Sequence, residues 1–248
     1  MTHQEVDLSR RDLIKTTGLG AAVAATAAVL PSQAKAGSDL PVQYAMVIDT
    51  RRCIGCHACS IACKTEFAVP IGKTRSWVEY VEKGVYPNVA RSFLPRLCNH
   101  CTKPACVPVC PTGATFKRKQ DGIVVVDADM CIGCGYCVLA CPYNARFINP
   151  LTGSADKCDF CLHRVSQGIA PSCVNTCQGK ARIFGDMNDP ESEVAKLIAS
   201  EPVTVLRQEM GTEPNVYYIA ADHADPGDLR YEGQYVRVDT HRQVKERM

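Results

Sequence analysis

The sequence predicts an α+β fold in which two cysteine-rich units are interleaved along the chain, with loop-rich insertions and an N-terminal signal segment. Three observations support this prediction. Sixteen of the 248 residues are Cys, and they fall into four groups of four. Short strand patterns alternate with short helical patterns around these groups. The N-terminus carries a charged stretch followed by an apolar run.

The composition excludes several classes of protein. The 28 Lys and Arg residues nearly balance the 26 Asp and Glu residues, so the net charge is only +2. A nucleic-acid-binding protein needs a strong basic excess, and we therefore expect no nucleic-acid partner. With 46% hydrophobic and 22% charged residues, the chain has the composition of neither a disordered protein nor a bundle of membrane helices.

Residues 1–36 have the features of a twin-arginine signal peptide. Arg10 and Arg11 stand in a stretch similar to the bacterial S-R-R-x-F-L-K motif, with two aliphatic substitutions at the Phe and Leu positions. The apolar run at 16–30 is shorter than the roughly 20 residues of a membrane-spanning helix. The A-K-A sequence at 34–36 has the small-residue pattern of a cleavage site.

Cleavage of this segment would leave residues 37–248, which contain no second long apolar run. We therefore expect a periplasmic protein without a membrane span in the mature chain, held at the membrane through a partner subunit. An amphipathic terminus or an uncleaved anchor is the alternative interpretation of the same segment.

Four quartets account for every cysteine of the chain, and each is a candidate set of metal ligands. They are Cys53, Cys56, Cys59 and Cys63; Cys98, Cys101, Cys106 and Cys110; Cys131, Cys134, Cys137 and Cys141; and Cys158, Cys161, Cys173 and Cys177. Quartets one and three share the pattern C-I-G-C-x2-C-x3-C and form an internal repeat.

The spacing within the quartets favours iron–sulfur clusters over the two other common uses of cysteine. A C-x2-C-x2-C run followed by a fourth Cys is the ligand pattern of a [4Fe–4S] cluster. Zinc sites usually combine two separated C-x2-C pairs, and disulfides between such crowded thiols would be strained. Gly55 and Gly133 allow the backbone to approach a cluster closely, and Pro111 and Pro142 supply the Cys-Pro ending of bacterial ferredoxins. The sequence therefore predicts four [4Fe–4S] clusters.

Four quartets predict two ferredoxin-like units, because in two-cluster ferredoxins the fourth Cys of each run ligates the neighbouring cluster. The spacing alone leaves the pairing of the quartets open. Quartets two and three are adjacent and both end in Cys-Pro, so we expect them to form one unit at 98–142. Quartets one and four would form the other unit from 37–97 and 143–200, followed by C-terminal strands and a polar tail at 201–248.

Local patterns predict the regular elements around the quartets. Strands are expected at 45–49, 76–82, 93–97, 123–127, 182–184, 203–206 and 216–220. A short helix is expected at 191–200, further short helices follow the cysteine loops, and 223–248 is expected to be an extended polar tail.

Histidines and cations near the quartets have two interpretations. One interpretation of His57, His100 and His163 is that they tune cluster potentials through hydrogen bonds to sulfur. Packing or surface roles are the expected interpretation, because Cys already supplies four ligands per cluster. The cations either raise the potentials of the anionic clusters or are solvated charges. These cations are Arg51, Arg52, Lys64, Arg96, Lys157, Arg164, Lys180 and Arg182.

The quartets and their surroundings resemble a known family. The four quartets, the eleven-residue gap between Cys161 and Cys173, the C-P-Y-N-A-R sequence at 141–146 and G-K-A-R-I-F-G-D at 179–186 are similar to the four-cluster electron-transfer subunit of molybdopterin oxidoreductases. The resemblance covers roughly residues 43–220. The stretch at 205–219 looks most like the subunits of tetrathionate, polysulfide and thiosulfate reductases.

The resemblance implies which cysteines share a cluster. The implied sets are Cys53, Cys56, Cys59 and Cys177; Cys158, Cys161, Cys173 and Cys63; Cys98, Cys101, Cys106 and Cys141; and Cys131, Cys134, Cys137 and Cys110. The unit of quartets one and four would face the catalytic subunit, and the other unit would face the membrane anchor.

The function implied by the resemblance is electron relay between a quinone- or quinol-linked polytopic membrane anchor and a molybdopterin catalytic subunit of a respiratory, sulfur-compound oxidoreductase. The sequence contains no phosphate-binding glycine loop and no nucleophile elbow, so a non-catalytic subunit is expected. The alternatives are a free-standing periplasmic poly-ferredoxin carrier, or the electron-transfer subunit of a nitrite- or sulfite-linked membrane complex. A zinc-stabilised binding module would be colourless, whereas an iron–sulfur protein is brown.

Overall fold

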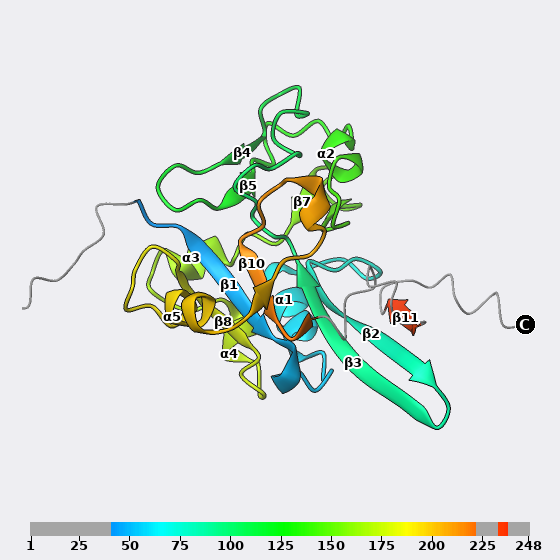
Figure 1. The fold of residues 1–248 in the computed structure, drawn as a ribbon. Helices are drawn as coiled ribbons and strands as arrows, with labels where there is room; N and C mark the ends of the chain where they lie inside the picture. Colours follow the sequence, from blue (N-terminus) through cyan, green and yellow to red (C-terminus); the bar gives the residue numbers. More distant parts are fainter. Residues whose placement is uncertain (1–40, 222–232, 238–248) are drawn as a thin grey trace, which may run out of the picture. The chain divides into compact units, whose positions relative to one another are not determined.

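The computed structural model describes residues 41–221 and 233–237 of the chain (Figure 1). These residues belong to one compact unit and contain both helices and strands, as the α+β prediction expects. The predicted signal segment at 1–36 and most of the predicted polar tail lie outside the described residues. No helix within the described ranges is long and apolar enough to cross a membrane.

A four-stranded sheet lies in the core. Its strand order is β8 (Arg182–Asp186), β1 (Tyr44–Asp49), β10 (Val216–Ile219) and β9 (Val203–Thr204). Strand β1 pairs antiparallel with β8 and parallel with β10. All four of these strands were predicted from the sequence, because their apolar residues form short continuous runs that end at polar residues or turns.

The two faces of β1 contact different parts of the core, because successive side chains of a strand point to opposite faces. Ala45 and Val47 pack with Val194 of helix α5 (Glu193–Ser200). Met46 and Ile48 belong to a second apolar cluster that includes several of the cysteines. Burial of each large apolar side chain contributes about 1.5–3 kcal/mol. The central sheet therefore has helix α5 on one face and the cysteine-rich core on the other.

A long hairpin adds a second sheet. Strands β2 (Ser76–Val85) and β3 (Asn88–Leu97) pair antiparallel, and β11 (Gly233–Arg237) pairs with β2. At the base of the hairpin, Trp77 and Leu94 are buried. Arg96 and Glu79 are also buried there and form an ion pair at 3.1 Å. Both hairpin strands extend beyond their predicted bounds, because the residues near the tip lack an alternating apolar pattern. Strand β11 lies in the region predicted as an extended tail.

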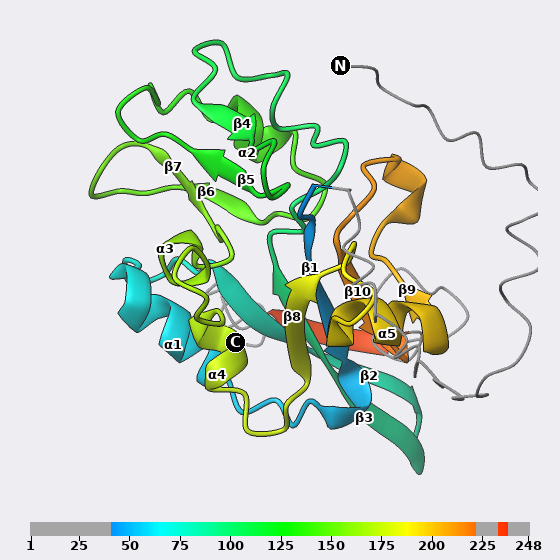
Figure 2. The same cartoon turned by 90° about the vertical axis from the view of Figure 1, so that its left-hand side faces the viewer.

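Short elements hold the cysteine loops. Figures 1 and 2 show one group of them gathered at one end of the central sheet and a second group beside it. The first group consists of β4 (Thr115–Lys117), β5 (Val124–Val126), α2 (Tyr136–Leu139), β6 (Arg146–Ile148) and β7 (Ala155–Lys157). The second group consists of α1 (Ala58–Phe67), α3 (Leu162–Val165) and α4 (Ser172–Asn175). Two 3₁₀ turns, η1 (Thr50–Arg52) and η2 (Gln208–Met210), complete the described elements.

Three of the short strands were not predicted from the sequence. Strands β4, β6 and β7 each contain three residues, which is too short for an apolar alternation to stand out. Backbone pairing with a neighbouring segment holds them instead, as between β6 and β7.

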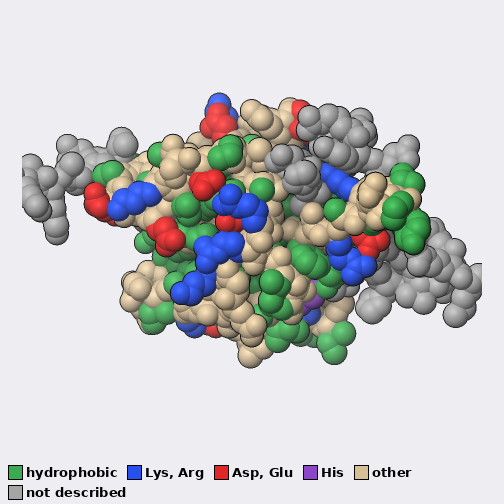
Figure 3. Space-filling view, turned by 60° about the horizontal axis from the view of Figure 1, so that its bottom comes forward, with side chains coloured by type: hydrophobic (Ala, Val, Ile, Leu, Met, Phe, Trp, Pro, Cys, Tyr) green, Lys and Arg blue, Asp and Glu red, His purple; other side chains and the backbone are tan. Residues whose placement is uncertain are grey.

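On one face of the molecule, basic and acidic side chains are interspersed with apolar ones (Figure 3).

Candidate metal centres

All sixteen cysteines lie in the described part of the chain, and none is in a disulfide. Short helices carry or follow the cysteine loops: α1 contains Cys59 and Cys63, α2 contains Cys137, and α4 contains Cys173. Within residues 41–221 and 233–237, no three His, Cys, Asp or Glu side chains converge on the position of one metal ion. Eight of the cysteines instead line two hollows.

One hollow is surrounded by Cys residues from quartets one and four. Cys53, Cys56 and Cys59 line it together with Cys177, and the hollow is partly open to solvent. Cys177 is the fourth Cys of quartet four. The structure therefore brings three thiols of one quartet together with the last thiol of another.

A second hollow repeats this arrangement with quartets two and three. Cys98, Cys101 and Cys106 line it together with Cys141, and this hollow is also partly open to solvent. Tyr143 and Thr212 also line this hollow, and their hydroxyl groups are hydrogen-bonded at 2.5 Å. Here too, the fourth thiol comes from a quartet other than the first three.

In a third set, the last thiol of quartet one, Cys63, lies near three thiols of quartet four. Burial, followed by the neighbouring Cys173 and Cys161 thiols, raises the pKa of Cys63 to about 12. Burial raises the pKa of Cys158 well above its ordinary value, and Cys63 and Cys173 add to this effect. Such thiols remain protonated near neutral pH unless a cation stabilises the thiolate, which is what a bound iron would do.

Three of the remaining thiols, Cys131, Cys134 and Cys137, lie in α2 or shortly before it. Cys131 and Cys137 pack in one apolar cluster with Val124 and Ala155. Cys110 is partly exposed. Against the effect of burial, hydrogen bonds from the Thr115 and Ala114 backbones and from Thr112 lower the pKa of Cys110 to about 7.

The four quartets share one backbone feature that the sequence showed for only two of them. The residue before the second Cys has a positive φ in every quartet: Gly55 (68°), His100 (44°), Gly133 (69°) and Phe160 (55°). Gly is the residue that adopts this conformation readily, so only quartets one and three were recognisable. His100 and Phe160 were missed because their residue types do not signal a left-handed turn.

Two of these turns direct a backbone N–H group towards sulfur, and so does the segment after Cys177. The N–H of Phe160 donates to Cys158 Sγ at 3.4 Å, and the N–H of Gly55 donates to Cys53 in the equivalent position. The N–H of Ala181 donates to Cys177 Sγ at 3.2 Å. Donors facing thiolate sulfur stabilise negative charge, so the four-cysteine hollows fit an anionic iron–sulfur cluster.

The histidines near the quartets contact other side chains. His57 is hydrogen-bonded to Tyr80, and burial lowers the pKa of its imidazole. His100 is fully buried, accepts the N–H of Val124 at Nδ1 (3.1 Å) and stacks on Phe160 with ring centroids 3.8 Å apart. His163 is paired with Glu66 at 2.7 Å.

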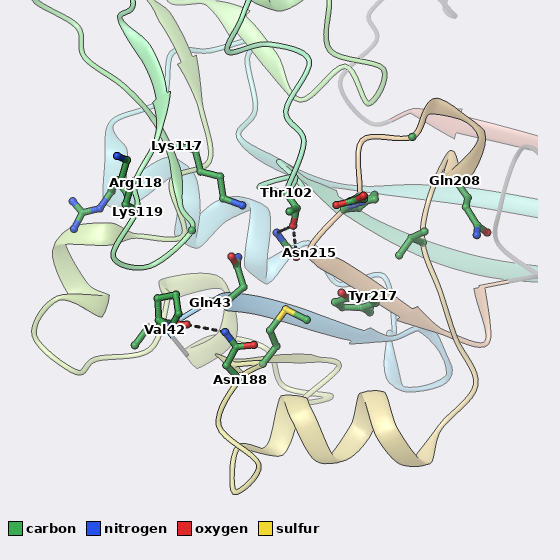
Figure 4. A pocket seen from close by; sticks show the side chains of 17 residues that line it. Val42, Gln43, Thr102, Lys117, Arg118, Lys119, Asn188, Gln208, Asn215 and Tyr217 are labelled. Atoms are coloured by element: carbon green, nitrogen blue, oxygen red, sulfur yellow. Dashed lines mark hydrogen bonds between the residues drawn. The ribbon is translucent and has the colours of Figure 1, made fainter. Parts of the chain in front are cut away.

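A groove separate from these hollows contains none of the sixteen cysteines (Figure 4). It is lined by the start of the described chain, the β4–β5 turn and the segment before β10. Thr102 and Asn215 are hydrogen-bonded in its wall at 3.2 Å, and Asn188 donates to the Pro41 carbonyl at 2.7 Å. The lining of the groove therefore combines apolar side chains with basic and amide ones and contains no set of cysteine ligands.

We expect Gly133→Ala to impair the third quartet's loop. An added Cβ would overlap the carbonyl oxygen of Gly153, and the positive φ of 69° would add about 1–2 kcal/mol of strain. Gly135→Ala is the matched control, because Gly135 has a φ of 79° but nothing within 4 Å of the added Cβ. Denaturant unfolding with visible absorbance and iron analysis should show lower stability and iron retention for Gly133→Ala than for Gly135→Ala. Equal losses would contradict the overlap.

Two families of iron–sulfur domains match the chain. A 4Fe-4S binding domain matches residues 46–67, which contain quartet one, and a 4Fe-4S dicluster domain matches residues 89–187, which contain the other three. These matches assign 4Fe–4S clusters to the chain as its class of cofactor.

The chain is also similar to components of known reductases. It is 51% identical over 186 residues to the B subunit of tetrathionate reductase from Salmonella typhimurium, covering 73% of this chain and 74% of that protein. It is 44% identical over 211 residues to the B subunit of selenate reductase from Mesobacillus selenatarsenatis, covering 72% of each. It is 44% identical over 221 residues to a Protein NrfC homolog of Haemophilus influenzae, covering 88% of this chain and 97% of that protein.

Proposed function

This chain belongs to the iron–sulfur beta subunits of molybdopterin oxidoreductases, and from that premise we propose that it relays electrons through four [4Fe–4S] clusters between a molybdopterin catalytic subunit and a quinol-linked membrane anchor. Two of its relatives are B subunits of reductases, so we expect a catalytic subunit as its partner. When bound, each cluster supplies a site for one electron.

We assign four cysteines to each cluster. The hollow of Cys53, Cys56, Cys59 and Cys177 holds one cluster, and the hollow of Cys98, Cys101, Cys106 and Cys141 holds another. The neighbouring thiols Cys63, Cys158, Cys161 and Cys173 hold a third. The same exchange of fourth ligands assigns Cys110 to the cluster of Cys131, Cys134 and Cys137.

The exposure of two of the cysteines is the observation that best supports the proposed relay. Of the sixteen, Cys56 and Cys134 alone are exposed, and they belong to different proposed units. Exposed apolar side chains accompany both: Ile54 beside Cys56, and Ile132 and Tyr136 beside Cys134. A relay needs an entry and an exit that a partner protein can cover, and an apolar rim suits such a contact.

Contacts between the proposed units support a continuous path. His100 lies in the second quartet and Phe160 in the fourth, and their stacked rings join the loops that hold Cys98 and Cys158. Both rings are buried, so water is excluded from this junction. The clusters that Cys56 and Cys134 would hold are then within reach of solvent or of a partner, while the junction lies inside the protein.

We further propose a sulfur compound as the terminal substrate of the complex and the periplasm as its location. The first proposal rests on the similarity to a component of tetrathionate reductase. The second rests on the twin-arginine pattern at Arg10 and Arg11, which lies outside the described residues. The anchor subunit would hold the chain at the membrane.

Purification of the tagged full-length chain from membranes tests the relay. We expect it to co-purify with a molybdenum-containing subunit and with a polytopic membrane protein, and we expect quinol to reduce its clusters in that preparation. A cluster-loaded chain recovered alone from the soluble fraction would favour the free-standing carrier instead. The identity of the molybdenum subunit distinguishes a sulfur-compound reductase from a complex of another kind.

A further inference from the structure

Two buried arginines occupy equivalent positions after the last Cys of quartets three and four. Arg146 follows Cys141, and Arg182 follows Cys177, in the same pattern C-x3-A-R. Each is the first residue of a strand, β6 or β8. In both cases the N–H of the preceding alanine donates to the cysteine sulfur. The pattern is therefore a structural repeat as well as a sequence repeat.

Arg146 contacts cysteines that belong to two proposed clusters. It is 4% exposed, and its Nη2 donates to Cys106 Sγ at 3.0 Å while its Nη1 donates to Thr115 Oγ1 at 3.2 Å. Although burial opposes it, the Cys106, Cys98 and Cys137 thiols raise the pKa of Arg146. Cys106 and Cys98 line one hollow, and Cys137 belongs to the neighbouring set.

Arg182 has the same relation to the other two proposed clusters. It is 3% exposed, and its Nη2 donates to Ser76 Oγ at 2.9 Å, while its buried Nη1 has no hydrogen-bond partner among the described residues. Although burial opposes it, the Cys59 and Cys173 thiols raise the pKa of Arg182. Cys59 lines the first hollow, and Cys173 belongs to the set around Cys63.

Neither guanidinium has a carboxylate partner in the part of the chain that the structure describes. The ion pairs there involve other residues, including three of the cations that flank the quartets: Arg51 pairs with Asp49, Arg96 with Glu79, and Arg164 with Glu66. An unpaired buried cation is strongly unfavourable. The thiolates of two anionic clusters are therefore the counter-charge that each arginine needs.

We propose, on the ligand sets of the proposed function, that Arg146 and Arg182 each raise the reduction potentials of one pair of clusters. Reduction adds one electron to a cluster, and the nearby guanidinium stabilises this added charge. The guanidinium stays protonated throughout, so the step takes up no proton there. Charges in a buried site are weakly screened. Arg96 and Arg164 lack this effect because carboxylates neutralise them locally.

Redox titration of the purified complex, with dithionite as reductant and electron paramagnetic resonance as the readout, tests this role. We expect Arg146→Gln to decrease the reduced-to-oxidised ratio of its two clusters about tenfold at a fixed potential, a shift of about 59 mV for one electron. The clusters beside Arg182 should keep their potentials. Arg182→Gln should give the reverse pattern, so each variant is the matched control for the other.

Charge-conserving variants separate the effect of charge from that of packing. Arg146→Lys and Arg182→Lys should retain most of the wild-type potential of their pairs, and they decide the question if a glutamine variant fails to load its clusters. Lysine variants that shift potentials as much as glutamine, or shifts spread over all four clusters, would overturn the proposal. Wild-type protein with fewer than four clusters would instead contradict the proposed function, independently of the arginines.

Discussion

Replacing Cys110 by Ser is expected to alter the cluster of Cys131, Cys134 and Cys137, while the cluster of Cys98 and its neighbours stays unchanged. Cys110 follows the second quartet's loop, and the proposed exchange of fourth ligands assigns it to the neighbouring cluster. Serine can ligate iron through oxygen, but as a harder ligand it should lower that cluster's potential or yield a three-iron form. The effect should therefore be large and confined to one cluster.

Cys141→Ser is the matched control for this experiment. Cys141 lines the hollow of Cys98, Cys101 and Cys106, so its replacement should alter that cluster instead. Iron analysis and electron paramagnetic resonance of anaerobically purified protein provide the measurement, with about 16 iron and 16 sulfide per wild-type chain as reference. If Cys110→Ser and Cys98→Ser alter the same spectral component, the quartets are self-contained and the exchange is wrong.

The double variant Arg10→Lys with Arg11→Lys is expected to leave cluster-loaded protein in the cytoplasm. Iron–sulfur clusters must be inserted before export, and the twin-arginine pattern is the signal that we assign to this step. Replacing both arginines keeps the charge of the segment but removes the motif. Cell fractionation with iron analysis should show loss of the exported protein and retention of iron in the cytoplasmic fraction.

The chain offers a second adjacent arginine pair as a control. Arg51 and Arg52 lie in η1, where Arg51 pairs with Asp49 at 2.9 Å, and their replacement by Lys conserves charge in the same way. That variant should be exported normally. An unchanged location of the Arg10 and Arg11 variant would disprove the assignment of the signal.

Much of the cluster chemistry was predictable because it depends on residues close together in the chain. A C-x2-C-x2-C loop brings three thiols together through a few backbone torsions, so its spacing alone indicates iron–sulfur ligation. The matching 4Fe-4S domains cover the same residues. The apolar run that forms β1 was also recognisable, because residues 45–48 are four consecutive apolar residues, and all four are buried.

Contacts across long stretches of chain were decided by the tertiary structure. The sequence left the pairing of quartets open, whereas the fold brings Cys177 to the hollow of Cys53 and Cys141 to that of Cys98. Arg146 was not singled out from the sequence, because its C-x3-A-R pattern acquires meaning only when its guanidinium lies against Cys106.

The left-handed turns at His100 and Phe160 illustrate the same division. Their residue types do not favour a positive φ, so the surrounding packing must hold the backbone there, and the two rings stack on each other to do so. The sequence by itself determined the kind of ligand and the cofactor class, since these depend on local spacing. Tertiary structure decided which ligands and which cations meet, since those contacts form only when distant segments pack together.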